Sequence, residues 1–152
     1  MRVLLVEDDQ SVADGLLDGL SGANFETLHV MTGADALSSV NEFNPDIVLL
    51  DLGLPDMDGT DVCRQIRAFS HVPIIVASAR ETEMDRVDVL EIGADDYITK
   101  PVSARILALR TSTQLRHRAL RTVTSGNTIT AGPLPSASMT AAISFEQSCR
   151  SA

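Results

Sequence analysis

Short apolar runs that end abruptly in acidic residues constrain the fold of this chain more than any other feature. Residues 47–50 are an unbroken run of branched aliphatic side chains that stops at Asp51. Residues 2–6 form a second strand of the buried type, and it stops at Glu7. Strands without polar alternation are typical of a parallel sheet covered on both faces. The acidic residues would then lie at the carboxyl ends of strands, where open α/β sheets bind their ligands.

The rest of the chain up to residue 121 continues this alternation of strands and helices. We expect strands at about residues 2–6, 25–30, 46–51, 74–77 and 96–99. Apolar residues at helical spacing predict helices at about residues 10–20, 34–41, 59–69, 84–92 and 103–121. Five strands that alternate with five helices predict a doubly wound parallel sheet with helices on both faces and right-handed crossovers.

Composition changes beyond Arg121, where Ser, Thr, Ala, Gly and Pro dominate and charge almost disappears. We therefore expect a folded domain at residues 1–121 and a linker or disordered tail at residues 122–152. No apolar run approaches the ~18 residues that a membrane helix needs, and no basic and apolar leader precedes the first strand, which favours a cytoplasmic protein. Cys63 and Cys149 suggest no disulfide framework.

Charge is distributed unevenly along the chain. Residues 1–102 carry 20 acidic against 6 basic residues, a net charge of −14, whereas residues 103–152 carry 1 acidic against 6 basic residues, a net charge of +5. An acidic body does not attract nucleic acid, so contact with DNA would need another domain. The arginines of the last helix could be a nucleic-acid patch, but we favour a solvated helix end with cations that complement its dipole. They are Arg105, Arg110, Arg116, Arg118 and Arg121.

Five polar side chains are expected to converge at one edge of the sheet, because they follow four different strands. They are Glu7 and Asp8, Asp51, Ser78 and Lys100. Three carboxylates repel one another unless a cation joins them, and hard oxygen ligands suit Mg²⁺. An ionised Asp51 could then attack phosphorus as a nucleophile, while Ser78 and Lys100 bind phosphoryl oxygens.

With these residues in view, residues 1–121 resemble a response-regulator receiver domain of the OmpR/PhoB branch, the CheY-like class of two-component systems. The matching segments are residues 3–9, 45–59, 73–80 and 93–101. The resemblance implies a flavodoxin-like or CheY-like strand order of 2-1-3-4-5. It also implies that Asp51 accepts a phosphoryl group from a phosphohistidine on a sensor histidine kinase.

The resemblance assigns further roles around Asp51. Glu7 and Asp8 would hold Mg²⁺, Asp8 directly and Glu7 partly through water, and Gly53 would add its backbone carbonyl. Lys100, the only lysine of the chain, would bind phosphate, and the bond before Pro101 would be cis. The domain would not be an enzyme beyond its own phosphorylation and dephosphorylation.

The same resemblance predicts how a signal leaves the site. Ser78 would move to hydrogen-bond the phosphoryl group, and Tyr97 would swing inward into the vacated space. This switch would reshape a face formed by residues 84–92, 96–99 and 103–121, on which the OmpR/PhoB branch forms homodimers. Arg86, Asp96 and Arg110 would lie on this face.

Two departures from the branch pattern affect this dimer face. Ile106 stands where a glutamate would partner Arg86 across the dimer, and Val102 replaces a larger phenylalanine. We therefore expect a dimer that is weaker or packed differently.

Two functions remain open at this stage. In the first, the receiver controls transcription through a winged-helix DNA-binding domain, which the residues after Arg121 are too few to encode. In the second, it acts alone through protein–protein contacts, with or without phosphorylation. An aspartate-nucleophile phosphatase is disfavoured because Gly53 occupies the position of the required second aspartate. A flavodoxin-like cofactor binder is disfavoured because Glu7, Asp8 and Asp9 would repel the phosphate of FMN.

Overall fold

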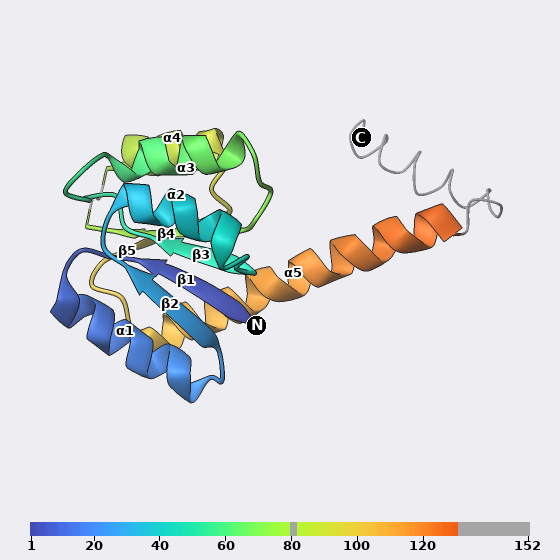
Figure 1. Ribbon diagram of the computed structural model, residues 1–152, viewed down its shortest axis with the longest axis horizontal. Helices are drawn as coiled ribbons and strands as arrows, with labels where there is room; N and C mark the ends of the chain where they lie inside the picture. Colours follow the sequence, from blue (N-terminus) through green and yellow to red (C-terminus); the bar gives the residue numbers. More distant parts are fainter. Residues whose placement is uncertain (80–81, 131–152) are drawn as a thin grey trace. The chain divides into compact units, whose positions relative to one another are not determined.

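A computed structural model describes residues 1–79 and 82–130 of the chain, with side chains to residue 121. Strands and helices alternate along it (Figure 1). The elements are β1 Arg2–Val6, α1 Gln10–Gly22, β2 Glu26–Val30, α2 Gly33–Glu42, β3 Ile47–Leu50, α3 Gly59–Arg67, β4 Ile74–Ser78, α4 Glu83–Ile92, β5 Asp96–Thr99 and α5 Ala104–Thr130.

The five strands form one parallel sheet in the order β2-β1-β3-β4-β5, which confirms the predicted fold class. Its register sets the carboxyl ends of the strands level with one another. Leu50, the last residue of β3, lies opposite Val6 at the end of β1, and Ser78 at the end of β4 lies opposite Thr99. The residues that directly follow these strands therefore meet at one edge.

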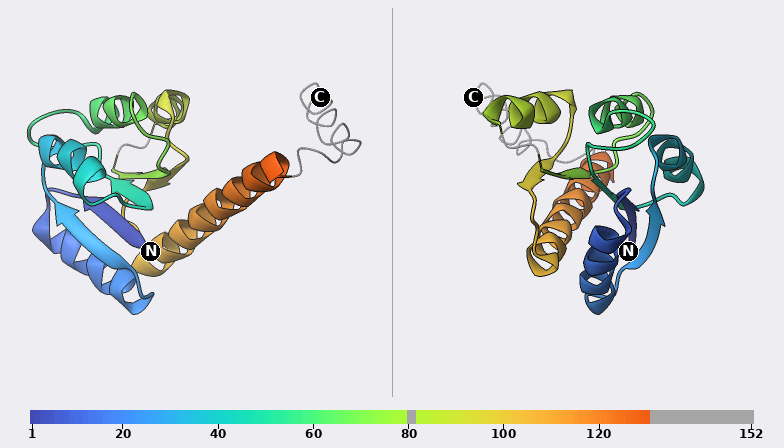
Figure 2. Two further views of the ribbon diagram at one scale, coloured as in Figure 1. Left: turned by 45° about the vertical axis from the view of Figure 1, so that its right-hand side comes forward. Right: turned by 90° about the vertical axis from the view of Figure 1, so that its left-hand side faces the viewer.

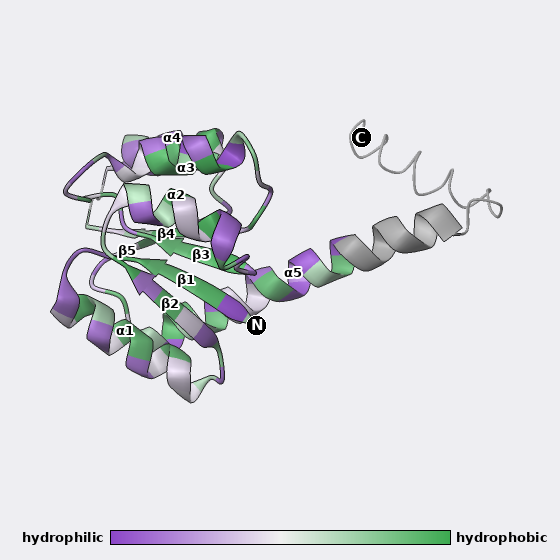
Figure 3. Ribbon diagram, in the orientation of Figure 1, coloured by the Kyte–Doolittle hydropathy of each residue, from purple (hydrophilic) through white to green (hydrophobic). Residues whose placement is uncertain are grey.

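The sheet separates two apolar layers. Helices α2, α3 and α4 cover one face, and α1 covers the other together with the first part of α5 (Figures 1 and 2). Alternate strand residues serve the two layers: in β1, Leu4 packs toward α2 and α3, whereas Leu5 packs toward α1 and α5. The inner strands β1, β3 and β4 are therefore apolar along most of their length, whereas the edge strands β2 and β5 also carry polar residues, and the helices are apolar on one side (Figure 3). Burial on both faces explains why the inner strands show no polar alternation.

The helices begin at capping residues that the sequence provides. The side chains of Asp9, Thr32, Asp58 and Thr82 each accept a hydrogen bond from a backbone N–H in the first turn of α1, α2, α3 and α4. Such caps satisfy N–H groups that have no partner within the helix. Gly93 ends α4 with φ at +129°, a backbone conformation that glycine adopts without steric cost.

The last helix differs from the prediction. It ends at Thr130, whereas we expected it to end near Arg121 and to be followed by a linker. The first proline after Arg121 is Pro133, so the sequence up to Thr130 holds no residue that blocks a helix, and a single glycine costs only about 1 kcal/mol. The rest of the expected tail lies outside the described residues.

Residues 1–115 form one compact unit, and residues 116–152 are a second. Residues 116–130 of the second unit are helical. Within the described residues, no helix is both long and apolar enough to cross a membrane.

Candidate functional site

The polar residues predicted to converge do line one pocket at the carboxyl edge of the sheet. Its volume is about 510 Å³. Its lining includes Glu7, Asp8, Asp51, Gly53, Ser78 and Lys100. Glu7, Asp51 and Lys100 directly follow β1, β3 and β5, and Ser78 is the last residue of β4 rather than the first after it. Strand topology alone is thus enough to gather them.

Three carboxylates gather within this pocket. Glu7, Asp8 and Asp51 each present an oxygen atom, and these atoms lie within 4.8 Å of one another. Glu7 is 2% exposed and Asp51 is 9% exposed, so two of the three negative charges are largely removed from water. A donor set made only of carboxylate oxygens fits a hard divalent cation such as Mg²⁺.

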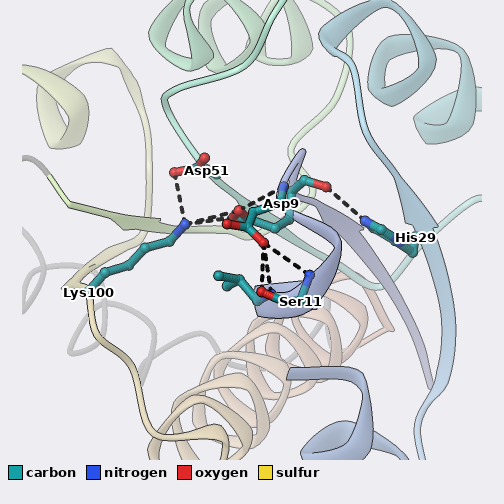
Figure 4. A network of polar contacts seen from close by, with 7 residues as sticks. Asp9, Ser11, His29, Asp51 and Lys100 are labelled. Atoms are coloured by element: carbon teal, nitrogen blue, oxygen red, sulfur yellow. Dashed lines mark hydrogen bonds and ion pairs between the residues drawn. The ribbon is translucent and has the colours of Figure 1, made fainter. Parts of the chain in front are cut away.

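The Lys100 ammonium group is the positive charge of the site. Its Nζ lies 2.7 Å from Oε2 of Glu7 and 3.4 Å from Oδ1 of Asp51 (Figure 4). Burial alone would lower the pKa of Lys100, but its hydrogen bond to Glu7 and the charge of Asp51 outweigh burial and raise that pKa. Lys100 is therefore held as a cation between the two buried carboxylates.

Glu7 is held in a defined position by both its side chain and its backbone. Burial raises the pKa of Glu7, and the hydrogen bond from Lys100 opposes that rise. The backbone N–H of Glu7 donates to the carbonyl of Val30, and its carbonyl lies 2.8 Å from Nε2 of His29 (Figure 4). His29 was not singled out from the sequence, because only the register of β1 against β2 brings it to Glu7.

Asp51 sits where β3 leads into α3, and a glycine permits the close packing there. The Asp51 backbone N–H donates to the carbonyl of Val6, which continues the pairing of β3 with β1. Gly59, the first residue of α3, lies against this strand end, and a Cβ there would come 2.5 Å from the Asp51 carbonyl oxygen. Because that neighbour is backbone, any residue larger than glycine would displace the helix or the strand.

Ser78 and Tyr97, the two predicted switch residues, are both buried. Ser78 is 2% exposed and lines the pocket, and its carbonyl accepts a hydrogen bond from the Lys100 backbone N–H. Tyr97 is 7% exposed, so its side chain already lies inward, and the Arg86 guanidinium carbon lies 5.5 Å from the centre of its ring. The Lys100–Pro101 peptide bond is cis, as the resemblance implies.

The charged residues expected on the dimer face lie along α4, β5 and α5. Nη1 of Arg110 donates to both carboxylate oxygens of Asp96, at 3.0 and 3.1 Å. Arg86 donates to the hydroxyl of Thr99 at 3.2 Å. The role of this face in dimerisation stays a prediction.

Asp56 makes a contact that the sequence analysis did not anticipate. Its two carboxylate oxygens accept hydrogen bonds from the backbone N–H groups of Gly33 and Ala34, at 2.8 and 3.0 Å. These are the first two residues of α2. Asp56 belongs to the segment between β3 and α3, and a carboxylate in a loop carries no sequence signal for a partner so distant in the chain.

Comparison with known proteins agrees with this geometry. The response regulator receiver domain family matches residues 3–112. The sensory transduction protein RegX3 of Mycolicibacterium smegmatis is 52% identical over 117 residues, which cover 77% of this chain and 51% of that protein. The DNA-binding response regulator MtrA of Mycobacterium leprae is 48% identical over 115 residues, which cover 76% of this chain and 51% of that protein. The chain thus spans about half the length of these curated relatives.

Solved receiver domains have the same fold. The BeF3-activated receiver domain of Klebsiella pneumoniae RstA superposes with a TM-score of 0.73 at 31% identity, over 76% of this chain and 99% of that one. The receiver domain of the Francisella response regulator 1452 gives a TM-score of 0.74 at 27% identity, over 77% of this chain and 98% of that one. Both likenesses cover nearly the whole of the solved domains.

Proposed function

The chain belongs to the response regulator receiver domain family of two-component systems, and from that membership we propose that Asp51 is its phosphoacceptor. Receivers of this family work with sensor kinases as signalling domains rather than as classical enzymes. The observation that carries the proposal is the gathering of three carboxylates and the Lys100 ammonium group at the carboxyl edge of the sheet.

The proposed reaction is a phosphoryl transfer to the side chain of Asp51. A carboxylate oxygen of Asp51 attacks phosphorus and forms a new P–O bond, while the P–N bond to the phosphohistidine of the kinase breaks. The imidazole leaves with the electron pair of that bond and is protonated. The ammonium group of Lys100 and the hydroxyl of Ser78 bind phosphoryl oxygens while the phosphoryl group passes to Asp51.

Glu7, Asp8 and Asp51 would hold Mg²⁺, with the backbone carbonyl of Gly53 as a further oxygen ligand. A bound Mg²⁺ would neutralise phosphoryl charge and allow an anionic donor to approach an anionic pocket. Without it, three carboxylates face the donor and Lys100 supplies only one compensating charge. We therefore expect phosphorylation to depend on Mg²⁺.

Phosphorylation would then change the face formed by α4, β5 and α5. A phosphoryl group adds roughly −2 charge and several acceptor oxygens beside Ser78. We propose that the Ser78 hydroxyl turns to this group and that the inward position of Tyr97 becomes favoured. The ring of Tyr97 lies under Arg86 of α4, so its position can influence the packing of that helix. A dimer formed through this face would be the output.

The output of this receiver is proposed to be control of transcription. The curated relatives, of whose length this chain spans about half, include a protein described as a DNA-binding response regulator. By analogy, DNA would be contacted by an effector domain and not by residues 1–115. Signalling through protein–protein contacts alone is the alternative, and it would not require DNA.

The proposed function is tested by intact-mass spectrometry after incubation with acetyl phosphate, with and without Mg²⁺. We expect one phosphoryl adduct on the wild type that depends on Mg²⁺ and is absent from Asp51→Asn. Far-ultraviolet circular dichroism would show whether both proteins are folded. A folded wild type without an adduct would refute the phosphoacceptor role, and an adduct that persists in Asp51→Asn would refute the assignment to Asp51.

A further inference from the structure

The segment between β3 and α3, residues 51–59, carries two groups of the proposed site. It begins with Asp51 and includes Gly53, whose carbonyl is proposed as a metal ligand. Within the segment, the Leu52 carbonyl accepts hydrogen bonds from the N–H groups of Leu54 and Gly59. The bond from Gly59 joins the loop to the start of α3, and Gly53 pairs with Asp58 in an isolated bridge, but none of these contacts attaches the loop to α2.

Asp56 supplies such an attachment. Its carboxylate accepts hydrogen bonds from two backbone N–H groups at the start of α2, where the helix dipole favours a negative charge. These hydrogen bonds lower the pKa of Asp56, so the group is ionised at neutral pH. The side chain of the neighbouring Met57 packs on the first turn of α2 at Gly33. It lies so close that a Cβ on Gly33 would come 2.5 Å from the Cγ of Met57. The loop is thus seated on the first turn of α2.

We propose that Asp56 is a positioning residue of the phosphorylation site, which holds the β3–α3 loop on α2 so that Gly53 and Asp51 keep the geometry that Mg²⁺ requires. The effect on Mg²⁺ binding and phosphorylation rests on the proposed function, whereas the attachment of the loop to α2 does not. The ligands of a metal ion must be held in narrowly defined positions, and residues that contact the ligands without binding the metal help to hold them there. Release of Asp56 would leave the Gly53 carbonyl on a loop free to shift.

Thr32 provides a matched control. Its hydroxyl accepts a hydrogen bond from the Asp35 N–H at 3.1 Å and caps the same first turn of α2 from the residue before the helix rather than from the β3–α3 loop. Thr32→Ala and Asp56→Ala therefore both weaken the start of α2, and only Asp56→Ala frees the loop. Asp56→Asn retains one carbonyl oxygen as an acceptor and should give an intermediate effect.

The first readout needs no metal. Amide hydrogen exchange, followed by NMR in Mg²⁺-free protein, should be faster at Leu54 and Gly59 in Asp56→Ala than in wild type, and unchanged there in Thr32→Ala. The second readout is Mg²⁺ binding, followed by amide shifts during titration with MgCl₂. The Mg²⁺ dissociation constant should rise on the order of tenfold in Asp56→Ala, less in Asp56→Asn, and least in Thr32→Ala.

The third readout is the rate of phosphorylation by acetyl phosphate. In Asp56→Ala the Mg²⁺ concentration for half-maximal rate should rise, whereas the rate at saturating Mg²⁺ should fall less. Equal behaviour of Asp56→Ala and Thr32→Ala in exchange or in Mg²⁺ affinity would overturn the inference. If the exchange pattern holds but wild type shows no response to Mg²⁺, the proposed function fails and the seating of the loop stands.

Discussion

Gly15 and Gly19 of α1 offer a test of the packing between α1 and α5, because one substitution should have opposite effects at the two positions. Both glycines lie in the helix, one turn apart. A Cβ on Gly15 would have no neighbour within 4 Å, whereas a Cβ on Gly19 would collide with the Cβ of Ala104 in α5. The Cα of Ala104 would also lie 3.2 Å away, so the backbone of α5 limits any relief.

The expected magnitudes follow from two terms. Alanine in place of glycine within a helix stabilises it by about 0.5–1 kcal/mol, and this gain applies at both positions. Overpacking costs about 1–3 kcal/mol and applies only at Gly19. Gly15→Ala should therefore raise the free energy of unfolding by about 0.5–1 kcal/mol. Gly19→Ala should leave it nearly unchanged or lower it by up to about 2 kcal/mol.

The difference between the two variants, about 1–3 kcal/mol, isolates the contact with α5 because the helix term cancels. Urea unfolding followed by far-ultraviolet circular dichroism suits the measurement, since the chain has no tryptophan and only one tyrosine. Ala104→Gly added to Gly19→Ala should recover part of the loss, because it removes the Cβ that causes the collision. Equal stability of the two single variants would refute the close approach of α1 to α5.

Four further predictions concern separate features. Thr111 is fully buried and its hydroxyl has no hydrogen-bond partner, so Thr111→Val should stabilise the domain by about 1–2 kcal/mol in urea unfolding, whereas Thr111→Ser should destabilise it. Arg67 donates to the carbonyls of Val72 and Gly93, so Arg67→Ala should cost about 2–3 kcal/mol; a cost below 1 kcal/mol would contradict these bonds. The pKa of Asp56 is lowered by two N–H groups, so its contribution to stability is complete above pH 3.8 and is lost as pH falls through its folded-state pKa. The difference in urea midpoint between wild type and Asp56→Asn should accordingly become smaller as the pH falls below 3.8. Tyr97→Ala should abolish dimerisation that depends on phosphorylation, as measured by light scattering; an unchanged dimer would exclude the switch.

The fold could be predicted from the sequence because each strand carries its own evidence. Residues 47–50 are apolar at every position, and β1 is apolar after Arg2, which is typical of strands buried on both faces. Alternation with helices then limits the topology to a parallel sheet with crossovers. The gathering of Glu7, Asp51 and Lys100 follows from that topology alone. It requires no knowledge of how any side chain is oriented.

The partners of individual side chains are less predictable, because the hydrophobic pattern of the sequence does not give the distances between residues that are far apart in the chain. Lys100 was expected to bind phosphate, and the structure adds that it contacts Glu7 more closely than Asp51. The inward position of Tyr97 is decided by packing against both the sheet and Arg86. The end of α5 differs from the prediction because a change of composition does not by itself end a helix, and no proline stands between Arg121 and Thr130.

The position of Lys100 has a consequence for how the site would work. In the structure its ammonium group is shared between Glu7 and Asp51, and it neutralises part of their charge. A cation that binds the three carboxylates would take over that task, since it would offset their repulsion with two charges instead of one. Lys100 would then be free to donate to a phosphoryl oxygen on Asp51 without leaving Glu7 as an uncompensated buried anion. Mg²⁺ and Lys100 are thus expected to act in sequence on the same carboxylates.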